Sequence, residues 1–81
     1  MEEKALSVPQ VFVVTQIEVF IIGFSDDPEY YFKQIIELID GNNIAEHKEI
    51  MKYLYERLEF KGYLEYAAEF AKKYDIKTAN F

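Results

Sequence analysis

The prolines and glycines most constrain the fold, because they divide the sequence into four segments. Pro9 and Pro28 each follow closely after a residue that can cap a helix, and Pro is favoured in the first helical turn. Gly23, Gly41 and Gly62 stand at the segment ends, and Gly is common just after the last residue of a helix. We therefore expect an all-α fold, either a compact bundle of about four short helices or a pair of helical hairpins.

The first segment, residues 8–23, carries two opposing signals. Ser7 and Gln10 have the spacing of a capping box, which predicts a helix from about Val8 to Ile22. The same segment is rich in β-branched residues, which favour strands. These residues are Val11, Val13, Val14, Thr15, Ile17, Val19, Ile21 and Ile22. We prefer the helix, but a strand paired with a second subunit across a dimer stays open as the alternative.

The three later segments each have apolar residues at helical spacing. The second helix is expected to begin at Asp27 and Pro28 and to end at Gly41. The third is expected from about Asn43 or Ile44 to Glu59, and the fourth from about Tyr63 to Tyr74. The expected stripe of the third helix consists of Ile44, His47, Ile50, Met51, Leu54 and Leu58.

The length of 81 residues leaves room for one domain, which we place at residues 7–81 after a flexible tail at residues 1–6. So short a chain has little apolar surface to bury, and small domains compensate with disulfides, metals or association. Disulfides are excluded because the sequence has no Cys. We therefore expect self-association, with a homodimer as the simplest form.

The charge balance argues against two classes of partner. Fifteen acidic residues and nine basic ones give a formal net charge of −6, which would be repelled by nucleic-acid phosphates and anionic lipids. The most apolar stretch, residues 11–24, includes Gln16 and Glu18 and is shorter than the roughly 20 residues that cross a bilayer. The start of the sequence also lacks the pattern of a secretory signal. We expect no membrane association and a cytoplasmic location.

The sequence has no pattern typical of catalysis, and we expect no enzyme activity, cofactor or metal. A single histidine, His47, cannot form a two-His metal site within one chain. His47 falls in the apolar stripe of the third helix, where a packed side chain is its simplest interpretation, although a catalytic role at a dimer interface is an alternative. No glycine cluster could hold a phosphate group.

The C-terminal residues 66–81 suggest a second function. The stretch from Glu69 to Thr78 has the pattern of the first helix and turn of a helix-turn-helix, with Lys72, Lys73 and Lys77 as possible phosphate contacts. DNA binding is therefore the alternative function. The acidic balance opposes it, and so does the end of the sequence at Phe81, before a recognition helix.

The surplus of apolar and aromatic residues favours protein recognition. Residues 11–24 are apolar nearly all round, which one small core cannot cover. Tyr is favoured in interfaces because one end is apolar and the other polar. We therefore predict a small regulator or adaptor that binds itself, a larger protein, or both. The candidate interface residues are Phe12, Val19, Phe20, Ile22, Tyr53, Tyr55 and Tyr66.

Overall fold

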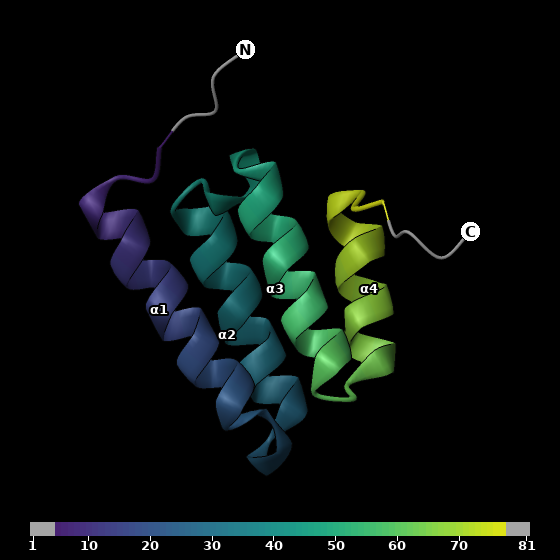
Figure 1. Ribbon diagram of the computed structural model, residues 1–81. Helices are drawn as coiled ribbons and strands as arrows, with labels where there is room; N and C mark the ends of the chain where they lie inside the picture. Colours follow the sequence, from purple (N-terminus) through teal and green to yellow (C-terminus); the bar gives the residue numbers. More distant parts are fainter. Residues whose placement is uncertain (1–4, 78–81) are drawn as a thin grey trace. The chain divides into compact units, whose positions relative to one another are not determined.

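The structure is a computed structural model that describes residues 5–77. Over this range it contains four α-helices, two short 3-10 helices and no strand (Figure 1). The elements are α1 (Val8–Ile22), η1 (Phe24–Asp26), α2 (Pro28–Gly41), η2 (Ile44–Glu46), α3 (Lys48–Phe60) and α4 (Leu64–Tyr74). The prediction of an all-α fold with four short helices is confirmed, and the strand alternative for residues 8–23 is wrong.

Local hydrogen bonds explain why residues 8–22 are helical despite their β-branched composition. The Gln10 backbone N–H donates to Ser7 Oγ at 3.2 Å, and the Ser7 N–H donates to Gln10 Oε1 at 3.0 Å. This capping box satisfies two backbone donors at the helix start. At the other end the Gly23 N–H donates to the Val19 carbonyl at 3.1 Å. β-Branched residues lower helix propensity only slightly, so capping and packing outweigh them.

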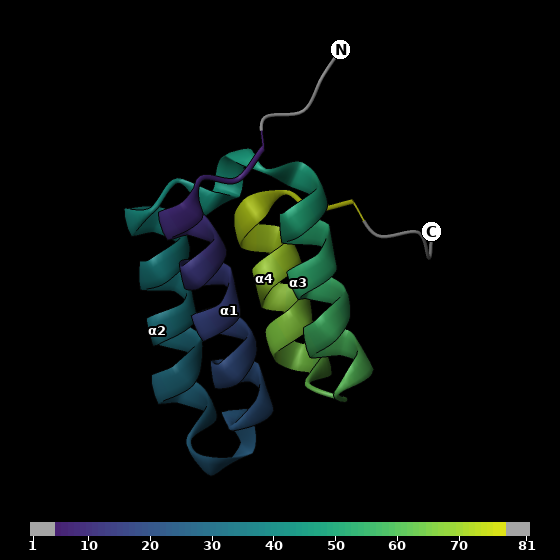
Figure 2. The same ribbon diagram turned by 60° about the vertical axis from the view of Figure 1, so that its left-hand side comes forward.

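The helices fall into two units, of which the first ends at His47 and the second begins at Lys48. In the first unit α1 and α2 lie side by side as a helical hairpin, joined through η1 (Figures 1 and 2). The Gln10 side-chain amide donates to the Asn42 carbonyl at 2.8 Å and links the start of α1 to the end of α2. The buried apolar residues of this unit are Val14, Ile17, Ile21, Phe24, Phe32, Ile35, Ile39 and Ile44.

The second unit is a helical hairpin of α3 and α4 (Figure 2). Its buried apolar residues are Met51, Leu54, Tyr55, Leu58, Ala67, Phe70 and Ala71. Gly62 ends α3 with a positive φ of 89°. The Tyr63 N–H donates to the Leu58 carbonyl at 3.1 Å and the Gly62 N–H to the Glu59 carbonyl at 3.0 Å. Together these bonds form a Schellman motif, which directs the chain from α3 into α4.

The Gly62→Ala variant is expected to lower the free energy of unfolding by about 1–2 kcal/mol, because a Cβ strains a residue held at positive φ. Denaturation in urea, monitored by circular dichroism, measures this loss. Gly41→Ala is the matched control: Gly41 has no positive φ, and an added Cβ would meet nothing within 4 Å. Equal losses in both variants would contradict the role assigned to the backbone conformation of Gly62.

The start of the third helix differs from the prediction. Asn43 is left-handed with a φ of 58°, Ile44–Glu46 form η2, and His47 has a φ of −96° and a ψ of 89°. These backbone angles interrupt the helix, so α3 begins at Lys48 rather than at Asn43 or Ile44. The apolar spacing did not reveal the break because Ile44 and His47 are buried even though they lie outside α3.

Among the described residues, no helix is long and apolar enough to cross a membrane. The single domain at residues 7–81 and the flexible tail at residues 1–6 stay predictions. Residues 1–4 of that tail lie outside the described range.

Candidate interaction surface

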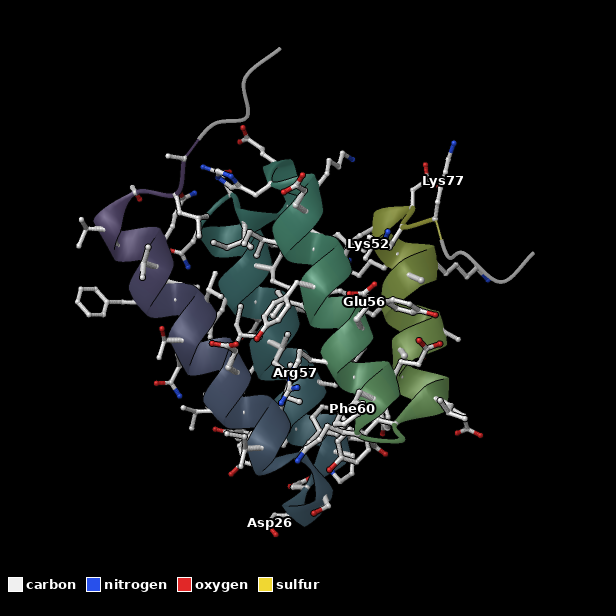
Figure 3. The ribbon with its side chains drawn as sticks, in the orientation of Figure 1. Asp26, Lys52, Glu56, Arg57, Phe60 and Lys77 are labelled. Atoms are coloured by element: carbon white, nitrogen blue, oxygen red, sulfur yellow. The ribbon has the colours of Figure 1, made fainter. Side chains whose placement is uncertain are left out.

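Helix α1 has apolar residues on two opposite sides. The side that includes Val14, Ile17 and Ile21 is buried. The other side carries apolar side chains that are 47–69% exposed. Together with one threonine they form what we call the α1 stripe: Val8, Val11, Phe12, Thr15, Val19 and Ile22. In Figure 3, side chains project from the side of α1 that faces away from α2.

The α1 stripe is continuous along the helix. Its residues recur every three or four positions, so they share an arc of about 100° on a helix with about 3.6 residues per turn. From Val8 to Ile22 the stripe is about 21 Å long at about 1.5 Å per residue. Exposed apolar residues on a monomer are usually scattered, and a contiguous patch marks a binding surface more often than a single exposed residue does.

The one polar side chain in the α1 stripe has a partner within the helix. The Thr15 hydroxyl donates to the Val11 carbonyl at 3.0 Å. A buried hydroxyl without a hydrogen bond would cost free energy, but this one keeps its bond when water is removed. The α1 stripe can therefore be covered by an apolar surface without leaving an unsatisfied hydroxyl group.

Charged residues are scarce on α1. Glu18 is the only charged residue between Val8 and Ile22, and the helix contains no Lys or Arg. Helices that lie on membranes or bind nucleic acid usually carry basic residues beside their apolar face. The composition of α1 therefore suits an apolar protein surface better than a phosphate-bearing one.

The structure brings three of the predicted interface residues together. Phe12, Val19 and Ile22 are 69%, 52% and 65% exposed and share the α1 stripe. Phe20 is half-buried, and its ring centroid lies 5.3 Å from that of Tyr31 in α2. Phe20 therefore contributes to the contact between α1 and α2 rather than to the α1 stripe.

Three predicted tyrosines belong to the second unit. Tyr53 is 41% exposed and Tyr66 is half-buried. Tyr55 is buried, and its hydroxyl donates to Glu59 Oε2 at 3.0 Å. Burial, the hydrogen bond to Glu59 and the charges of Glu59 and Glu56 raise the pKa of Tyr55. The placement of Tyr55 on an open surface is corrected, because its ring is enclosed and its hydroxyl already has an acceptor.

Sequence reasoning missed Val8, Val11 and Thr15 as members of the α1 stripe. The available signal was their three- and four-residue spacing from Phe12, Val19 and Ile22, which places all six on one side. It was obscured because the opposite side of α1 is equally apolar.

A smaller apolar pair lies at the turn between α3 and α4. Phe60 is 80% exposed and Leu64 is 62% exposed. The Arg57 guanidinium carbon lies 5.7 Å from the centroid of the Phe60 ring (Figure 3), within the range of a cation–π contact. This pair was not predicted from the sequence, because Phe60 and Leu64 fall beside the break at Gly62.

The remaining chemical candidates have little geometric support among residues 5–77. His47 is buried between η2 and α3, and this range has no group of three or more His, Asp or Glu residues that could hold a metal ion. Helix α4 ends at Tyr74 and is followed by Asp75 in the left-handed conformation. Thr78 and the rest of the helix-turn-helix pattern lie outside the described residues, so that alternative stays a prediction.

The α1 stripe is therefore the surface with the most distinctive geometry in the described part of the chain. Its assignment depends on exposure, spacing and hydrogen bonding within α1. Comparisons with protein-family models, with curated proteins and with solved structures found no match to this chain.

Proposed function

We propose that this protein is a non-enzymatic interaction module, a small regulator or adaptor that binds protein through the α1 stripe. The observation that carries the proposal is the exposure of five large apolar side chains on one side of a single helix. A soluble domain gains nothing in stability from such a surface, because its apolar area stays in contact with water. The surface becomes favourable when another protein covers it.

The exposed area is large enough to contribute to binding. From the exposed fractions, the apolar area of the α1 stripe is on the order of 400 Å². At about 25 cal/mol per Å², covering it contributes about 10 kcal/mol before the costs of association are subtracted. A helix that presents residues at three- and four-residue spacing is a common form of protein recognition.

A photocrosslinking amino acid at position 12 tests this function. We expect p-benzoylphenylalanine in place of Phe12 to form discrete protein adducts in the native cells, because Phe12 is exposed at the centre of the proposed contact. The same amino acid in place of Glu37, an exposed residue of α2, is the matched control. Mass spectrometry of the adducts identifies what each position touches. Equal labelling at both positions, or lipid adducts alone at position 12, would refute the proposal.

A further inference from the structure

We propose that the α1 stripe binds the α1 stripe of a second copy of this chain, with the two helices antiparallel across a two-fold axis at Thr15. This inference rests on the proposed function and names its partner. It uses three features of the α1 stripe: the order of its residues, the position of its smallest side chain and its area.

The spacing of the α1 stripe reads the same in both directions from Thr15. Val8, Val11, Thr15, Val19 and Ile22 follow one another at intervals of three, four, four and three residues. A two-fold axis requires a surface that is complementary to itself. In an antiparallel pair centred at Thr15, Val8 of one copy lies opposite Ile22 of the other, so no apolar residue extends past the end of its partner.

The side-chain sizes favour the antiparallel direction. The largest residue, Phe12, lies in the N-terminal half of the α1 stripe, whereas Val19 occupies the corresponding place in the C-terminal half. Antiparallel packing sets Phe12 of one copy beside Val19 of the other, which pairs a large side chain with a small one. The helix dipoles also oppose each other in this arrangement, which favours it over a parallel pair.

Thr15 lies where two helices would approach most closely. Its hydroxyl already donates to the Val11 carbonyl, so the contact at the axis leaves no hydroxyl group unpaired. Helices about 10 Å apart bring facing Cα atoms to about 5 Å, and a small side chain fits that space. A larger residue at this position would keep the helices apart.

The area sets the expected strength. Two α1 stripes would bury on the order of 800 Å² of apolar surface, which is near the lower limit for a specific contact. We therefore expect a reversible dimer that dissociates on dilution. Because each chain has a net charge of −6, added salt is expected to strengthen the dimer by screening the repulsion between copies.

Cysteine crosslinking tests the partner and the direction together, because the chain has no cysteine of its own. Under mild oxidation, Thr15→Cys is expected to form a disulfide-linked dimer, since facing Cα atoms about 5 Å apart lie within disulfide range. Val8→Cys alone is expected to stay unlinked, because its two copies lie about 21 Å apart along the helices. A mixture of Val8→Cys with Ile22→Cys is expected to form linked dimers. Glu37→Cys on α2 measures random crosslinking.

Each other outcome contradicts a defined part of the inference. Self-linked dimers of Val8→Cys and of Ile22→Cys would show parallel helices and overturn the antiparallel arrangement. If Thr15→Cys links no more than Glu37→Cys, and sedimentation equilibrium finds only monomer, a second copy is not the partner. Protein adducts of a different mass at position 12 would then leave the proposed function standing, whereas their absence would refute both.

Discussion

Replacing Phe12 and Ile22 together by aspartate is expected to leave the chain monomeric at concentrations where the unmodified chain is a dimer. Both side chains are more than half exposed, so the substitutions should not disturb the interior of the first unit. Covering two carboxylates with an apolar surface costs far more free energy than the lost apolar contacts alone. Sedimentation equilibrium from about 1 µM to about 1 mM spans the range in which a weak dimer dissociates.

The matched control for this experiment is a double aspartate variant in the second unit. Phe60 and Leu64 have exposures similar to those of Phe12 and Ile22, and they lie outside the α1 stripe. Phe60→Asp with Leu64→Asp is therefore expected to keep the dimer. Circular dichroism checks that both variants stay helical. Equal loss of association in the two variants would show that added negative charge, rather than the α1 stripe, controls the result.

Phe24→Ala is expected to lower the free energy of unfolding by about 3–5 kcal/mol, the range for removing a buried aromatic ring. Phe24 has no exposed surface, and its ring meets that of Phe32 edge to face with centroids 6.4 Å apart. The substitution would leave a cavity at the turn that joins α1 to α2. Urea denaturation measures the loss, and hydrogen exchange locates it in the amides of α1 and α2.

Phe12→Ala is the control for Phe24→Ala, because it removes the same ring from an exposed position in the same unit. At concentrations where the chain is monomeric, it should change stability by less than about 1 kcal/mol. Similar losses in the two variants would mean that the distinction between the buried and exposed sides of α1 is wrong.

The bounds of the helices were largely visible in the sequence, because helix ends depend on short-range chemistry. Ser7 with Gln10 and Asp27 with Pro28 mark two helix starts, and α1 and α2 begin where these residues indicate. The start of α3 was misplaced because the left-handed Asn43 and the extended His47 do not interrupt the apolar spacing. A break in the backbone that preserves the pattern of burial leaves no trace in hydrophobic periodicity.

The interaction surface could be predicted only in part. Phe12, Val19 and Ile22 were recognised from the excess of apolar residues in α1, whereas Phe20 was assigned to the same surface although its ring meets Tyr31. Tyr55 was assigned to a surface although it is buried. In an amphipathic helix the polar side identifies the exposed one, but α1 has no polar side to make that distinction.

The sequence by itself determined that this chain is helical, where most of its helices begin and end, and that its first helix carries more apolar residues than one contact can use. Those properties depend on caps, turns and composition within a few residues of one another. Only the tertiary structure decided which side of α1 is buried. That choice depends on how Ile17 and Ile21 pack in the hairpin with α2, and packing complementarity between distant segments is not encoded in the period of either one.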